Sequence, residues 1–185
     1  MKYEGIRVRM ESRLGNARIP LSIDVGFGDA ITPSPLTAEF PVLLDAPAPA
    51  IRMYPRETVI AEKLEAMVSL GEDNSRMKDF ADLWYLAQHF DFDGTLLAKA
   101  VSDTFTRRQT PLQARPIALT PAFAQIATKP AQWKAFLRRS SPQGMPANLG
   151  EVVDGIAAFL LPILAQLAAS QPVPGTWTAA GPWED

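Results

Sequence analysis

The chain has 185 residues, 47% of them hydrophobic and 21% charged, a composition typical of a soluble globular protein of about one domain. Its net charge of −2 excludes a general basic field for nucleic acid, so any RNA contact depends on local patches. Because the sequence contains no cysteine, disulfides and cysteine-ligated zinc or iron–sulfur sites are also excluded.

A β-hairpin is predicted at the start of the chain. Residues 4–14 and 18–27 alternate apolar and polar side chains around the turn sequence Gly15-Asn16. A two-stranded hairpin is marginal in water and leaves an exposed edge, so we expect dimerisation or strand pairing there. Residues 31–49 are rich in proline and alanine and predict an irregular connection to the helices that follow.

Asp24 is the polar residue of interest on the second strand. Its neighbours Ile23 and Val25 share one face with Leu21, so Asp24 points to the opposite face. From the pattern alone, a solvated aspartate on an open sheet face is the simpler interpretation. A carboxylate that faces an active-site cleft is the alternative.

Two short amphipathic helices are predicted next, the first from Pro55 to the stop at Gly71 and the second after a turn at 72–75. At about 100° per residue the first helix has an apolar stripe, and Glu62 and Glu65 lie on its far side. The stripe consists of Ile60, Leu64, Met67 and Val68. The buried face of the second helix consists of Met77, Phe80, Leu83, Trp84 and Ala87.

Charged residues flank both apolar faces. Lys63 lies at the edge of the first stripe and Asp79 at the flank of the second, where side chains are held by the core and still reach a cleft. A plain ion pair between the two helices explains the same positions. Lys78 and Asp82 are spaced i,i+4 on the outer surface, which is typical of a helix-stabilising pair.

Further helices are predicted at 94–107, at 121–138 with a break near Pro130, and at 149–168 with a cap at Asn148. Residues 170–185, with three prolines and two isolated tryptophans, predict a loosely attached tail. The adjacent arginines in Arg107-Arg108 and Arg138-Arg139 each close a predicted helix, where the helix dipole and RNA binding explain them about equally.

Targeting signals do not stand out in the sequence. The first residues lack the apolar core of a signal peptide. The most apolar stretch, Gly155 to Ala169, is shorter than the roughly 20 residues that span a bilayer. We therefore expect a cytoplasmic protein that does not contact a membrane.

The Asp-x-Asp sequence at Asp91-Phe92-Asp93 is not predicted to bind a catalytic metal ion. Clustered carboxylates of this kind hold metal when they lie on a strand, but no β-branched run leads into this one. It follows a helix end and precedes Gly94, so we interpret it as a linker and an N-cap for the next helix.

The two helices and the second strand resemble the AbiEii/AbiGii toxin family of nucleotidyltransferases, over roughly residues 15 to 140. The motifs that carry the resemblance are Tyr54-Pro55-x-Glu57-x-x-x-Ala61-Glu62-Lys63-Leu64-x-Ala66, Arg76-x-Lys78-Asp79-x-x-Asp82-Leu83 and Leu21-Ser22-Ile23-Asp24-Val25-Gly26-Phe27-Gly28-Asp29. The family is the toxin half of phage-defence toxin–antitoxin systems. The resemblance implies an α+β fold: a polymerase-β-like sheet, seen here as an antiparallel hairpin, followed by a helical bundle.

The resemblance also implies roles for particular residues. Asp24 matches the third active-site carboxylate, a metal ligand, and Lys63 matches a lysine that contacts nucleotide phosphate with support from Asp79. The same motif adds Arg76, Lys78 and Asp82 to the nucleotide-binding set. The implied chemistry uses Mg²⁺ to transfer a nucleoside monophosphate from a nucleoside triphosphate to tRNA or another RNA acceptor. A cognate antitoxin is the further implied partner.

The first catalytic motif of the family, a glycine turn before an Asp-x-Asp strand, is missing from the 23 residues that precede Asp24. We therefore expect a chain that opens in the middle of the fold: a sheet remnant at 1–50, a helical domain at 51–169 and the tail at 170–185. Three interpretations remain open. The chain is the C-terminal part of a toxin and silent on its own, a non-catalytic relative that binds an antitoxin or RNA, or a structural remnant.

Overall fold

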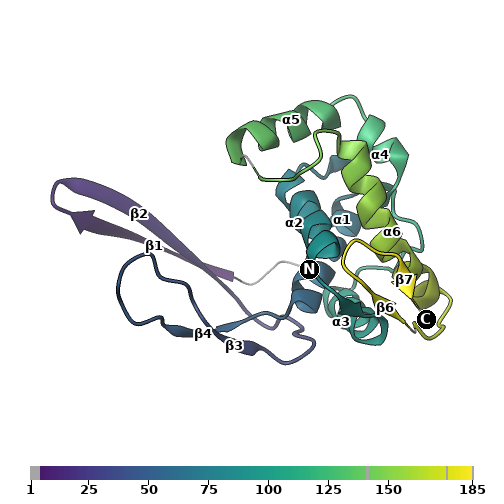
Figure 1. The fold of residues 1–185 in the computed structure, drawn as a ribbon, viewed down its shortest axis with the longest axis horizontal. Coiled ribbons are helices and arrows are strands. Elements are labelled where there is room, and N and C mark those ends of the chain that lie inside the picture. Colours follow the sequence, from purple (N-terminus) through teal and green to yellow (C-terminus); the bar gives the residue numbers. More distant parts are fainter. Residues whose placement is uncertain (1–4, 141, 174, 185) are drawn as a thin grey trace.

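An extended antiparallel ribbon and a smaller hairpin precede a helical body, so the fold is α+β, as predicted (Figure 1). The computed structural model describes residues 5–140, 142–173 and 175–184. The strands of these residues are β1 Gly5–Leu14, β2 Ala17–Gly26, β3 Leu36–Glu39, β4 Ala50–Met53, β5 Phe92–Asp93, β6 Thr176–Trp177 and β7 Trp183–Glu184. Their α-helices are α1 Arg56–Leu70, α2 Met77–His89, α3 Gly94–Arg108, α4 Pro121–Gln125, α5 Lys129–Ser140 and α6 Leu149–Ala168.

Strands β1 and β2 form the predicted hairpin, called the ribbon below. They pair along their whole length, from Gly5 opposite Gly26 to Leu14 opposite Ala17. Gly15 has a φ of +58° in the two-residue turn, and glycine adopts this conformation without a steric penalty. Figure 1 shows the ribbon projecting away from the helices, and both of its strands are exposed throughout.

The two faces of the ribbon differ in chemistry, because directly opposite residues share a face. One face carries large apolar side chains that are between 38% and 75% exposed: Ile6, Val8, Met10, Leu14, Ile19, Leu21, Ile23 and Val25. The opposite face carries charged side chains: Arg7, Arg9, Glu11, Arg13, Arg18 and Asp24. The ribbon is therefore amphipathic, and it has no covering layer within the described residues.

The connection predicted to be irregular over 31–49 contains a regular element. Strand β3 pairs with β4 in a second hairpin, with Leu36 opposite Met53 and Glu39 opposite Ala50. The prediction was wrong for residues 36–39, because four residues between prolines are too few for alternation to stand out from the surrounding loop.

A short anchoring segment, residues 28–33, joins the ribbon to the helical body. The hydroxyl of buried Thr58 donates to the carbonyl of Thr32 at 2.8 Å and accepts from the Thr32 N–H at 3.0 Å. Arg107 donates from Nε to the carbonyl of Gly28, and the Thr32 hydroxyl donates to Asp103. Arg107, predicted to serve either the helix dipole or RNA, therefore holds this loop.

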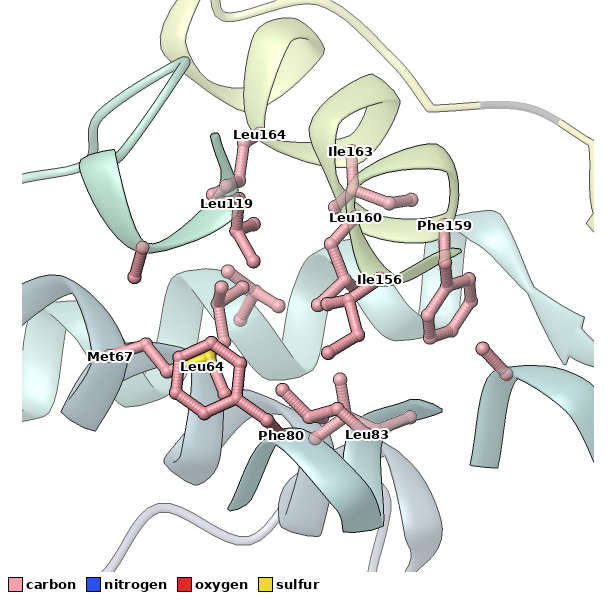
Figure 2. Close-up of a cluster of buried hydrophobic side chains, with 14 of the residues drawn as sticks. Leu64, Met67, Phe80, Leu83, Leu119, Ile156, Phe159, Leu160, Ile163 and Leu164 are labelled. Atoms are coloured by element: carbon pink, nitrogen blue, oxygen red, sulfur yellow. The ribbon is translucent and has the colours of Figure 1, made fainter. Parts of the chain in front are cut away.

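The helical core forms where α1, α2, α3 and α6 meet. Figure 2 shows Leu64 and Phe80 facing Ile156 and Leu160 of α6 across the core. The apolar stripe of the first helix is confirmed, since Ile60, Leu64, Met67 and Val68 are all buried. Burial of one such side chain stabilises the fold by about 1.5–3 kcal/mol. The packed core therefore holds the helices in place, and with them the charged residues at the flanks of their buried faces.

Helix α6 is the most apolar element, and its bounds match the predicted 149–168. By length and composition it is one helix that could cross a membrane, with a mean hydropathy of 1.7. It packs against α2, α3 and α4 through a buried stripe: Val152, Val153, Ile156, Phe159, Leu160, Ile163 and Leu164. Asn148 caps it as predicted, accepting from the N–H of Gly150 at 2.7 Å.

Two other predicted boundaries are confirmed with small differences. The helix expected over 121–138 with a break near Pro130 is two helices, α4 and α5, separated by residues 126–128. Pro130 lies in the first turn of α5, where its missing N–H leaves no hydrogen bond unmade. Asp93 caps α3 as predicted, accepting from Leu96 N at 2.7 Å, although Phe92 and Asp93 also form the short strand β5.

The prediction of a loosely attached tail is wrong for the described part of residues 170–185. Strand β6 pairs with β5 and β7, and Trp177 is only 3% exposed. The indole N–H of Trp177 donates to the carbonyl of Ala87 at 2.7 Å, and that of Trp183 donates to Phe159 at 2.9 Å. The two tryptophans attach this segment to the core, because Trp177 is buried, Trp183 packs partly buried against it, and both satisfy their polar N–H.

Candidate functional site

Lys63 of α1 lies between two carboxylates of α2. Its Nζ is 2.8 Å from Oδ1 of Asp79 and 2.7 Å from Oδ2 of Asp82. The lysine side chain is 18% exposed and that of Asp79 is 5% exposed. The predicted pair of Lys63 and Asp79 is therefore present, and Asp82, predicted to lie on the outer surface, joins it.

Two more cations complete the Lys63 cluster, defined as Lys63, Arg76, Lys78, Asp79 and Asp82. Arg76, directly before α2, places Nε 2.7 Å from Oδ2 of Asp79, although the N–H is poorly aligned for a hydrogen bond. Lys78 donates to Asp82 at 2.6 Å across one helical turn, as predicted. Three cations and two carboxylates leave the cluster with an excess of one positive charge.

The protonation of Lys63 is set by two opposed effects. Burial lowers the pKa of its ammonium group, but the hydrogen bonds that it donates to Asp79 and Asp82 outweigh burial and leave the pKa above its ordinary value. Because the shift is upward, any stability it adds is present below the ordinary lysine pKa and is lost only as the pH rises through the folded-state pKa. Lys63 is therefore charged throughout the physiological range.

A second charged cluster lies where α1 meets the end of α3. Arg108 donates to Glu65 at 2.7 Å and to Glu62 at 3.2 Å, and Thr110 also donates to Glu65. Burial raises the pKa of Glu62, while the nearby Arg108 charge opposes that rise. Glu65 lies on the far side of the apolar stripe of the first helix, as predicted, but it is buried there, because Arg108 and Thr110 give its carboxylate hydrogen-bond partners.

The two clusters border one open pocket of about 500 Å³, called the α1–α3 pocket below. It is lined by Val59, Glu62, Lys63, Arg76 and Arg108. Three of these side chains are cations and one is a carboxylate, so the lining favours an anion. Guanidinium and ammonium groups that converge on one pocket suit the oxygens of phosphate groups.

Asp24 is not among the residues that line this pocket. Its carboxylate is exposed on the polar face of the ribbon, with Oδ1 2.5 Å from Nε of Arg7 and Oδ2 2.8 Å from Nη2. The hydrogen bonds from Arg7 hold the pKa of Asp24 below its ordinary value. The structure thus brings Lys63, Asp79, Arg76, Lys78 and Asp82 together, and it leaves Asp24 paired on the ribbon.

A metal centre is not built by the described part of the chain. In that part, no group of three or more histidine, aspartate or glutamate side chains is placed to hold a metal ion. Asp24 supplies a single carboxylate, and Arg7 occupies both of its oxygens. Two Mg²⁺ ions need several carboxylates around them, so the residues in place do not fit this group.

Arg108 is the one cation of the pocket lining that the sequence prediction did not assign to nucleotide binding. The signal in the sequence is the adjacent pair Arg107-Arg108 at a helix end, which predicts an interaction with the helix dipole or with RNA. The two arginines make different contacts: Arg107 holds the anchoring segment, and Arg108 lines the pocket. Only the three-dimensional packing of α3 against α1 brings it beside Lys63.

Comparison with known proteins identifies one family. A family model described as nucleotidyl transferase AbiEii toxin, type IV TA system, matches residues 1–158 of this chain. The match includes the ribbon, the Lys63 cluster and the first half of α6. No curated protein and no solved structure gives a significant match.

Proposed function

Because this chain belongs to the AbiEii family of nucleotidyl transferase toxins from type IV toxin–antitoxin systems, we propose that its α1–α3 pocket binds the phosphates of a nucleoside triphosphate. The observation that carries the proposal is Lys63, which lines the pocket and is oriented by Asp79 and Asp82. A lysine that stays charged and fixed in place loses little side-chain freedom when phosphate binds.

The geometry of the pocket supports phosphate rather than a neutral ligand. Lys63, Arg76 and Arg108 all line the pocket, so an anion bound there is surrounded by cationic side chains. Arg76 is exposed and tied to a single carboxylate, which leaves it free to turn toward a ligand. Glu62 is the single acidic residue of the lining, and its raised pKa reduces the cost of bringing a polyanion near it.

The reaction class we propose is transfer of a nucleoside monophosphate to an RNA hydroxyl with release of pyrophosphate. Within this chain Lys63, Arg76 and Arg108 hold the triphosphate, and Asp79 and Asp82 position Lys63. Asp24 is the one sheet carboxylate we assign to the reacting end. Since the residues in place do not fit two Mg²⁺ ions, we expect no transfer by this chain alone; the remaining carboxylates must come from another polypeptide segment.

Binding of nucleotide tests the pocket directly. We expect ATP or another nucleoside triphosphate to bind in isothermal titration calorimetry, and Lys63→Ala or Arg76→Ala to weaken binding about tenfold, equivalent to about 1.4 kcal/mol. Lys134→Ala removes an exposed cation outside the pocket and serves as the matched control. Equal affinities for the wild-type chain and Lys63→Ala would assign Lys63 to a purely structural ion pair.

Nucleotide transfer tests the reaction class. We expect no labelled nucleotide to enter total tRNA with this chain alone. Transfer should appear when a polypeptide with a strand-borne Asp-x-Asp motif is supplied, and Lys63→Ala should then lower it at least tenfold. Robust incorporation by the isolated chain would show that the catalytic centre lies elsewhere. The role of Asp24 fails if Asp24→Asn leaves the reconstituted transfer unchanged.

Partners and location follow from the same family membership. Type IV systems pair a toxin with an antitoxin, and we propose that a cognate antitoxin binds this chain in the cytoplasm. The alternative function is a non-catalytic module that keeps only the surface for antitoxin or RNA. The exposed ribbon favours this non-catalytic alternative, because a long surface with one apolar and one charged face, left uncovered by the described residues, is suited to a macromolecular partner.

Self-association is a further proposal, and it uses the apolar face and edges of the ribbon. This face exposes on the order of 600 Å² of apolar side chains, so two copies face to face would bury about what a small stable interface needs. We expect a dimer by light scattering at about 100 μM, and Ile23→Lys should return it to a monomer. A wild-type monomer at that concentration would contradict the proposal.

A further inference from the structure

The polar face of the ribbon is unusually rich in arginine. On β1 this face carries Arg7, Arg9 and Arg13, and Arg18 joins it from β2. The two acids on the face are Glu11 and Asp24, so four positive charges stand against two negative ones. The chain as a whole has a net charge of −2, and this face is therefore a local positive patch on an acidic protein.

The arrangement of charges near the tip of the ribbon destabilises the folded hairpin. Arg13 and Arg18 are directly opposite each other on the same face, a placement in which like charges destabilise the strand pair. They share one acid, Glu11, at 2.9 Å from Arg13 and 4.0 Å from Arg18. All three side chains are well exposed, so the ion pairs are worth little. An external anion would relieve this repulsion.

The patch also has a direction. It begins at the tip with Arg13 and Arg18, continues through Arg9, and ends at the base with the pair of Arg7 and Asp24. Strands of ten residues extend about 33 Å, long enough to lie beside several nucleotides of an RNA strand. A strand bound along the patch would bring its reacting hydroxyl toward Asp24.

We propose that the polar face of the ribbon binds the phosphate backbone of the acceptor RNA and leads it to Asp24. The inference rests on the proposed function, because it assigns a surface to the acceptor of that reaction. Arginine suits the task, since its planar guanidinium donates two hydrogen bonds to one phosphate.

A membrane surface is the less suitable occupant. The arginines and the apolar side chains point to opposite sides of the ribbon. With the apolar face in lipid, the arginines would therefore point to water rather than toward the anionic headgroups. Interfacial segments instead keep their basic side chains where they reach the headgroups.

The test is fluorescence anisotropy of the full chain with a labelled single-stranded RNA of 20 nucleotides, titrated between 50 and 300 mM KCl. We expect the variant Arg9→Ala/Arg13→Ala/Arg18→Ala to bind at least tenfold more weakly at 100 mM salt. The slope of log K against log salt should fall by about 2, since each lost phosphate contact on a single strand removes about 0.7.

The matched control removes three exposed cations elsewhere, Arg52→Ala/Arg115→Ala/Lys134→Ala, and should bind RNA within twofold of wild type. Lysine at positions 9, 13 and 18 should restore most of the salt slope. Unchanged RNA affinity in the ribbon variant, or an equal loss in the control variant, would overturn the inference. So would wild-type binding to anionic lipid vesicles that exceeds binding to RNA.

Two further measurements separate this inference from the proposed function. Lys63→Ala should keep full RNA affinity while its nucleotide binding falls, because the pocket and the patch are different surfaces. The ribbon variant should keep nucleotide binding. A wild-type chain that binds RNA but not nucleotide would contradict the proposed pocket alone. A wild-type chain that binds nucleotide but not RNA would contradict the proposed RNA-binding patch alone.

Discussion

Trp177→Ala is expected to destabilise the folded chain by about 3–5 kcal/mol, the usual cost of removing a buried tryptophan. The ring is packed against Phe159, with centroids 4.9 Å apart, and against Trp183 at 5.7 Å. Its N–H also donates to the carbonyl of Ala87 in the last turns of α2. The substitution therefore opens a cavity and leaves a buried carbonyl without that donor. Urea unfolding followed by circular dichroism measures the loss.

Phe40→Ala is the matched control, because it removes an aromatic ring that is 54% exposed. The control should change the free energy of unfolding by no more than about 0.5 kcal/mol. A loss below about 1 kcal/mol for Trp177→Ala would mean that residues 175–184 are attached only weakly to the core.

Asp79→Ala is expected to destabilise the chain by about 2–3 kcal/mol. Removal of one partner from a buried ion pair leaves the other charge poorly compensated, which is costlier than loss of the pair itself. Asp82 still holds Lys63 and Arg76 can move into water, so the expected cost lies below that of a fully isolated buried charge. The measurement is again urea unfolding at neutral pH.

A double-mutant cycle completes this test. The cycle consists of Lys63→Met, Asp79→Leu and Lys63→Met/Asp79→Leu. The double variant replaces both charges with apolar side chains and should regain most of the stability lost in Asp79→Leu. Lys78→Ala, which removes an exposed partner of Asp82, should cost at most about 0.5 kcal/mol. Additive single effects in the cycle would show that Lys63 and Asp79 do not interact in solution.

Local periodicity explains how much of this fold could be predicted from the sequence. The ribbon alternates over ten residues on each strand, and α1, α2 and α6 carry clear apolar stripes, so these elements were predicted correctly. Lys63 and Asp79 were also predicted as a pair, because their angles on the two helices follow from the same periodicity. These features depend on neighbours close in sequence.

The features that the sequence did not predict depend on contacts between distant residues. Trp177 meets a carbonyl 90 positions earlier, and Arg108 meets Glu65 43 positions earlier. Nothing in the local pattern of either segment carries that information. The burial of Glu65 in particular requires Arg108 and Thr110 to arrive from α3 and the loop after it. Sequence periodicity gives the angle of this glutamate on its helix, but it does not say which element packs against that side.

Gly28 restricts what mutation can do to the link between ribbon and helices. Its φ of +74° is one that side chains rarely adopt, and a Cβ there would collide with the guanidinium of Arg107. Since that guanidinium holds the Gly28 carbonyl, any substitution must strain the backbone and loosen its own tether at once. Thr58, Asp103 and the helical core lie outside this conflict. Part of the cost of such a mutation is therefore a change in the orientation of the ribbon relative to the helices, which a measurement of folding stability does not report.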